Sequence, residues 1–85
     1  MNTMELNGAM ARKGKSSNDL ARAIRKSHVS FNKKRFGEVP FDLNEICGVV
    51  TELELDLQQV NEIFFDGNLR DSKFCYILQK NITAE

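Results

Sequence analysis

Apolar side chains recur at intervals of three and four residues along most of the chain, which is the spacing of one face of an α-helix. The clearest stripe runs from Leu43 through Ile46 and Val50 to Leu53. Read with the start and stop signals of the chain, the pattern predicts five short helices. These predicted helices cover residues 3–13, 17–25, 28–36, 43–53 and 57–66.

Polar caps mark three of the expected helix starts. In each, a side chain before the helix can accept the third backbone N–H, and the side chain at that third position can reach back. The three capping boxes are Ser16 with Asp19, Asp42 with Glu45, and Asp56 with Gln59. Glycine, which tolerates the left-handed conformation of a helix end, stands at Gly14, Gly37 and Gly67.

The 85 residues, 41% of them hydrophobic, allow one small core and therefore one domain. We expect an all-α, compact five-helix domain over residues 1–68 and a distinct tail over residues 69–85. Within the tail, residues 73–79 alternate in the manner of a β-strand but have no partner strand in the chain. Such a segment could stay disordered, pack as an extended arm, or pair with its copy in a homodimer.

Several classes of protein do not fit this chain. No apolar run has membrane-spanning length and the N-terminus lacks the pattern of a secretory signal, so we expect a cytoplasmic protein with no membrane partner. Two cysteines and one histidine exclude a four-ligand zinc site built from those residues alone. The Gly14-Lys15-Ser16 run resembles the end of a phosphate-binding loop, but that motif needs glycine at Ala9. We therefore expect no enzyme, catalytic residue, metal, cofactor or small-molecule substrate.

A net charge of zero conceals a division of the chain. Residues 11–36 hold nine basic side chains and one acidic one, whereas residues 38–71 hold nine acidic side chains and one basic one. Such an asymmetry suggests a polyanionic partner for the basic part. It is equally typical of two solvated faces that attract each other.

The basic part contains two short helices separated by a tight connection. Leu20 and Ala21 lie on the first helix, and Ser27 can cap the second. Helices joined so closely cross at a steep angle, and a small residue such as alanine lets their backbones approach. The second helix would then project its N-terminal half outward, and a helix of this size fits the major groove of B-form DNA.

Residue spacings in this segment follow a known pattern. Residues 14–21, Gly-Lys-Ser-Ser-Asn-Asp-Leu-Ala, match an opening in which a first helix ends near glycine and Thr/Ser-Gln-x-x-Leu-Ala follows. Ser27, Phe31, Lys34 and Gly37 then match the pattern Ser-x-x-x-Phe-x-x-Lys-x-x-Gly without a gap.

The match continues toward the end of the predicted domain. Phe41, Asp42, Glu45 and Ile46 fit a phenylalanine, an acidic helix start and an isoleucine, and residues 61–65 read Asn-Glu-Ile-Phe-Phe. The chain thus resembles the phage Cro and lambda repressor-like class of helix-turn-helix domains. Within this class it is most similar to a small phage-repressor branch, and the resemblance covers most of the predicted domain.

The resemblance implies binding to double-stranded DNA through the helix that begins after Ser27. With Phe31 turned inward, His28, Val29 and Asn32 lie toward the exposed half and are our candidates for base contacts. Asn32 can pair with adenine through two hydrogen bonds, and Val29 can contact a thymine methyl group.

Phosphate contacts are expected around the same helix. The candidates are Ser17, whose backbone N–H lies at a helix N-terminus, and the clustered Lys33 and Lys34. Arg12 and Arg35 would add diffuse positive charge.

The resemblance as a whole implies a sequence-specific transcriptional regulator of phage or prophage, similar to a repressor or Cro. A homodimer, with residues 73–79 as a possible interface, would occupy an operator and exclude other proteins sterically. The chain departs from the family in the turn, where Arg25-Lys26 replaces glycine and an apolar residue. This departure and the acidic second half motivate an alternative, an antirepressor-like interaction module that keeps the fold without binding DNA.

Overall fold

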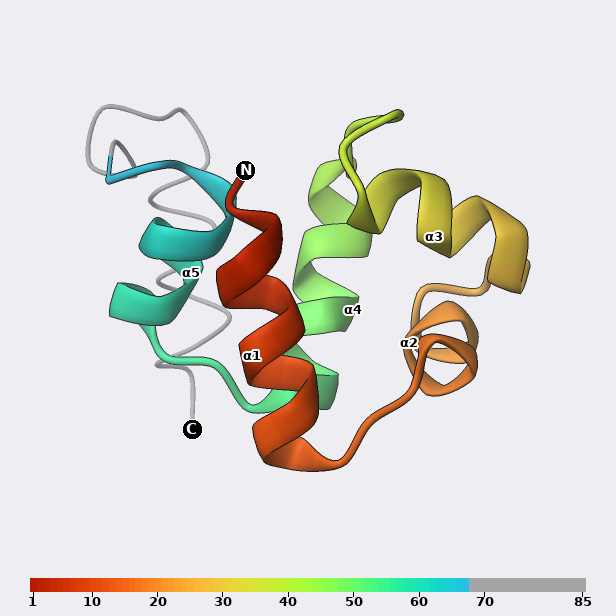
Figure 1. Cartoon of the computed structure of the whole chain (residues 1–85), viewed down its shortest axis with the longest axis horizontal. Coiled ribbons are helices and arrows are strands. Elements are labelled where there is room, and N and C mark those ends of the chain that lie inside the picture. Colours follow the sequence, from red (N-terminus) through yellow and green to blue (C-terminus); the bar gives the residue numbers. More distant parts are fainter. Residues whose placement is uncertain (68–85) are drawn as a thin grey trace.

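The computed structural model describes residues 1–67, which form five α-helices and no strand (Figure 1). The helices are α1 (Thr3–Lys13), α2 (Ser17–Ala23), α3 (His28–Arg35), α4 (Leu43–Leu53) and α5 (Leu57–Phe64). The all-α, five-helix prediction is confirmed for this part of the chain. The predicted tail, residues 69–85 with the strand at 73–79, lies outside the described residues.

Helix boundaries agree closely with the sequence pattern. Helices α1 and α4 have the predicted limits, whereas α2, α3 and α5 end one or two residues early, at Ala23, Arg35 and Phe64. All three predicted capping boxes are present at the starts of α2, α4 and α5. Helices α1 and α3 begin with simpler caps, in which Asn2 and Ser27 each accept one backbone N–H.

Residues with a left-handed backbone conformation follow the helices. Gly14, Gly37 and Gly67 have φ of 65°, 85° and 87°, as their positions predicted. Three residues other than glycine also take this conformation, namely Arg25, Glu54 and Asp66, with φ of 58°, 53° and 49°. A side chain in this region costs roughly 1–2 kcal/mol relative to glycine.

A single core joins all five helices. Its fully buried side chains include Leu6 of α1, Leu20 of α2, Phe31 of α3, Val49 of α4 and Val60 of α5. Rings of Phe41, Phe64 and Phe65 are partly buried against this core, and so is Cys47. The apolar spacing that predicted helices therefore also predicted the core.

The helices are arranged in two groups. Helix α1 packs against α4 and α5, while α3 packs chiefly against α2, which in turn contacts α4. Figure 1 shows α2 and α3 together on the side of the molecule opposite α5. The approach of α2 to α4 is close at Gly48, where an added Cβ would lie 3.2 Å from the Ala23 carbonyl oxygen and from Ile24. This architecture places α3 at the edge of the domain.

The helices within residues 1–67 are all too short or too polar to cross a membrane.

Candidate nucleic-acid interface

The connection between α2 and α3 is closed by backbone hydrogen bonds although it contains no glycine. The Lys26 N–H donates to the Ala21 carbonyl at 3.0 Å, and the Arg25 N–H donates to the Arg22 carbonyl at 3.1 Å. Arg25 takes the left-handed conformation that glycine usually supplies. Ile24 is buried and fixes the turn to the core. Arg25 and Lys26 therefore form a tight connection between α2 and α3.

Helix α3 divides into a buried side and an open side. Phe31 is completely buried, as expected for the residue that fixes the helix to the core. On the open side, His28 and Lys33 are exposed and Val29 has 64% of its surface accessible. Two of the three predicted base contacts, His28 and Val29, are thus exposed on the N-terminal half of α3, and Asn32, one helical turn after His28, is partly exposed.

A chain of polar side chains crosses this surface. The Arg35 guanidinium donates from Nε to Asn7 Oδ1 at 2.6 Å and from Nη1 to Ser17 Oγ at 2.7 Å. The Ser17 hydroxyl is 3.0 Å from Asn32 Oδ1, and Asn32 Nδ2 is 3.1 Å from Nε2 of His28. Helices α1, α2 and α3 are therefore connected through the candidate base-contacting residues.

Lys34 occupies a different environment from the other candidates. Its ammonium lies 2.7 Å from Oε1 of Glu45 on α4, and the Lys34 side chain is only 12% exposed. We expected Lys34 to contact phosphate; instead its charge is directed into the domain. Lys33, the neighbouring candidate, is exposed and has no ion-pair partner among residues 1–67.

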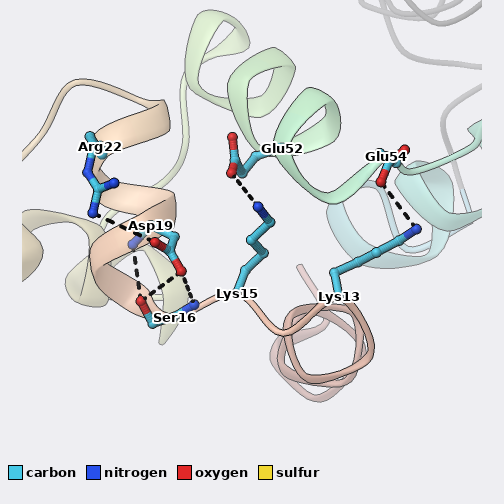
Figure 2. Close-up of polar contacts among 7 residues, drawn as sticks. All are labelled: Lys13, Lys15, Ser16, Asp19, Arg22, Glu52 and Glu54. Atoms are coloured by element: carbon cyan, nitrogen blue, oxygen red, sulfur yellow. Dashed lines mark hydrogen bonds and ion pairs between the residues drawn. The ribbon is translucent and has the colours of Figure 1, made fainter.

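Two further ion pairs join the basic part of the chain to the acidic part (Figure 2). Lys13 Nζ lies 3.5 Å from a carboxylate oxygen of Glu54, and Lys15 Nζ lies 3.0 Å from one of Glu52. The hydrogen bond from Lys15 to Glu52, with the Coulomb attraction of the pair, raises the pKa of Lys15. Several basic residues of residues 11–36 are therefore paired with carboxylates of residues 38–71.

Other basic side chains in the described part of the chain have no acidic partner. Within the described part of the chain, Arg12, Arg25, Lys26 and Lys33 form no ion pair. Arg25 and Lys26 stand just before Ser27, the N-cap of α3, and Lys33 lies on α3 itself. Three of these four cations therefore belong to α3 and the turn that precedes it.

Asp19 at the start of α2 illustrates the local electrostatics (Figure 2). Its carboxylate accepts hydrogen bonds from the Ser16 N–H at 2.9 Å and from the Ser16 hydroxyl at 3.0 Å. These bonds, led by the backbone one, lower the pKa of Asp19. Arg22 lies 3.7 Å away and acts in the same direction.

Sequence reasoning did not anticipate the part played by Arg35 and Asn7. Arg35 was expected to supply diffuse charge, and Asn7 carried no signal because its partner is 28 positions away in sequence.

Within residues 1–67, no three His, Cys, Asp or Glu side chains lie close enough together to hold a metal ion.

Comparison with known proteins adds no relative to this picture. No protein-family model, no curated protein and no solved structure matches the chain.

Proposed function

We propose that the protein is a sequence-specific regulator of transcription that binds double-stranded DNA through α3. The observation that carries this proposal is the open N-terminal half of α3, which is fixed at its back by the completely buried Phe31 and packs against α2. A helix presented in this way can enter a major groove. The resemblance to lambda repressor-like domains agrees with the five-helix order.

Within this proposal, the candidate side chains divide by chemistry. Asn32 and His28 would meet base edges by hydrogen bonds, and Val29 would contact a thymine methyl group. Lys33 and the N-terminus of α2 at Ser17 would contact phosphates. Lys34, held by Glu45, is left out of the interface.

The proposed mechanism is steric. A homodimer would place two copies of α3 in successive major grooves, about 34 Å apart, over a pseudo-palindromic operator. Occupation of that site would exclude polymerase or a competing regulator. The dimer contact proposed from the sequence, residues 73–79, belongs to the part of the chain beyond Gly67.

A second candidate function is supported by the ion pairs. Acidic residues of α4 and of the turn after it neutralise Lys13, Lys15 and Lys34, and so reduce the positive charge available to a polyanion. A helix-turn-helix unit with less free charge could instead bind another regulator, as an antirepressor would.

Selection of duplex sites from a random pool separates the two candidates. A DNA-binding regulator enriches a defined sequence, and its affinity falls steeply as salt rises. Asn32→Ala should weaken binding to the enriched site by about 10-fold, since a good base contact contributes roughly 1–3 kcal/mol. Asn44→Ala is the matched control, because Asn44 is an exposed asparagine on α4. Failure to enrich any sequence, with no salt-dependent binding to duplex, would reject the proposal.

A further inference from the structure

A continuous hydrogen-bond chain runs from Arg35 through Ser17 and Asn32 to His28. A guanidinium can only donate hydrogen bonds, so Ser17 Oγ, 2.7 Å from Arg35 Nη1, must accept there. The Ser17 hydroxyl in turn donates its single proton to Oδ1 of Asn32, 3.0 Å away. Asn32 thus faces Ser17 with its carbonyl oxygen.

The direction carries through to His28. With Oδ1 of Asn32 facing Ser17, the amide nitrogen Nδ2 faces His28 Nε2 at 3.1 Å. An amide NH₂ group can only donate, so Nε2 must accept. An imidazole that accepts at Nε2 is neutral and carries its proton on Nδ1. The chain thus selects one amide orientation of Asn32 and one tautomer of His28.

Arg35 itself is held firmly enough to start such a chain. Its Nε donates to Asn7 of α1, its backbone carbonyl accepts from the Thr3 hydroxyl at 3.2 Å, and its guanidinium carbon lies 5.0 Å from the Phe36 ring centre. The contacts to Asn7 and Ser17 are partly buried, which limits competition from water. Contacts from α1 and α2 therefore hold Arg35 in place in the free protein.

We propose that Arg35 is a positioning residue for base recognition, acting through Ser17 to set the donor and acceptor pattern that Asn32 and His28 present. This inference rests on the proposed DNA-binding function. Asn32 keeps one free N–H and one free lone pair on Oδ1, the pattern that matches N7 and N6 of adenine. His28 presents an Nδ1–H donor, which matches a purine acceptor such as guanine N7 or O6. The preferred site should hold an adenine beside a second purine.

The test uses variants that interrupt the chain at two points. Ser17→Ala removes the link, Ser17→Thr keeps the hydroxyl, and Arg35→Lys keeps the charge but loses the two-pronged donor. Arg12→Lys makes the same exchange at an exposed arginine without an ion-pair partner in the described part of the chain. Thermal melts select the variants that keep the fold.

Two measurements give separate answers. In the free protein, long-range ¹H–¹⁵N NMR correlations report the His28 tautomer; we expect the Nδ1–H form in the wild type and in Ser17→Thr, and a mixture of tautomers in Ser17→Ala and Arg35→Lys. In site selection, Ser17→Ala and Arg35→Lys should lose about 10-fold in preference for adenine at the base that Asn32 contacts, while the salt dependence of their affinity stays unchanged. Arg12→Lys should keep the preference for adenine.

The outcomes distinguish the inference from the function on which it rests. An unchanged tautomer and unchanged base preference in Ser17→Ala and Arg35→Lys would overturn the positioning role even if the wild type binds DNA. A wild type that selects no duplex would reject the proposed function, and the role in base recognition with it. The tautomer measurement would still report whether the hydrogen-bond chain exists.

Discussion

The ammonium of Lys34 lies 2.7 Å from Oε1 of Glu45, and the two side chains are only 12% and 4% exposed. This ion pair joins α3 to the first turn of α4. The same carboxylate oxygen accepts the Asp42 N–H at 2.9 Å as part of the capping box, while Glu45 Oε2 is buried and has no hydrogen-bond partner among residues 1–67. One carboxylate oxygen therefore holds both a helix start and the junction of two helices.

Loss of Lys34 should destabilise the protein strongly. Lys34→Met leaves the buried Glu45 carboxylate without a counter-charge, and breaking a buried pair in this way typically costs about 3–5 kcal/mol. The double variant Lys34→Met/Glu45→Gln removes the uncompensated charge and should recover much of the loss. Chemical denaturation followed by circular dichroism measures both.

Lys33 provides the matched control for this prediction. It is the neighbouring lysine on α3 but is exposed, so Lys33→Met should change the free energy of unfolding by no more than about 0.5 kcal/mol. Equal stabilities for the Lys33 and Lys34 variants would show that the ion pair contributes little.

Arg25→Gly should make the protein more stable. Arg25 is exposed, has a φ of 58°, and forms no ion pair in the described part of the chain, so glycine relieves the backbone at no cost in contacts. We expect a gain of about 1 kcal/mol, which raises the melting temperature of a small domain by roughly 4–8 °C. Lys26→Gly, one position later, should give no such gain. If the DNA-binding proposal holds, Arg25→Gly also weakens binding, because the cation three residues before α3 is lost. A melting temperature unchanged or lowered by Arg25→Gly would contradict the strain argument.

Local signals in the sequence were sufficient for most of the fold. The cap at Asp42 and the stripe from Leu43 to Leu53 predicted both limits of α4, because a helix start and an apolar face are encoded within a few residues. The left-handed ends at Glu54 and Asp66 were missed. Neither residue type signals this conformation, and the surrounding packing imposes it.

The candidate site was predictable in part. The exposure of His28 and Val29 follows from the position of Phe31 on the same helix, which is a local relation. The environment of Lys34 depends on Glu45, eleven residues away on a different helix, and that of Arg35 depends on α1. Contacts of this kind appear only when the helices are packed, so charge alone could not separate Lys33 from Lys34.

Asp19 should contribute to the loss of stability in acid. Hydrogen bonds from Ser16 lower its pKa below the ordinary value of 3.8. A carboxyl group whose pKa is lowered by folding stabilises the folded state fully above its unfolded pKa, and this contribution disappears as the pH falls through the folded pKa. Melting temperatures between about pH 5 and pH 2 should therefore fall less steeply in Asp19→Asn than in the wild type. Glu38→Gln, at an exposed carboxylate, should follow the wild type; identical curves for Asp19→Asn and the wild type would exclude this role.

Salt dependence tests which basic residues face DNA under the proposed function. Lys33 is exposed and unpaired among residues 1–67, whereas Lys15 lies 3.0 Å from Glu52 on α4. Each phosphate contact contributes about 0.9 to the slope of log affinity against log salt. Lys33→Gln should therefore reduce the slope by about 0.9 per protomer, while Lys15→Gln should leave it nearly unchanged. Fluorescence anisotropy on the selected duplex provides the slopes. An equal reduction in both variants would mean that the whole basic segment acts as diffuse charge, and that the open side of α3 has no special place in phosphate binding.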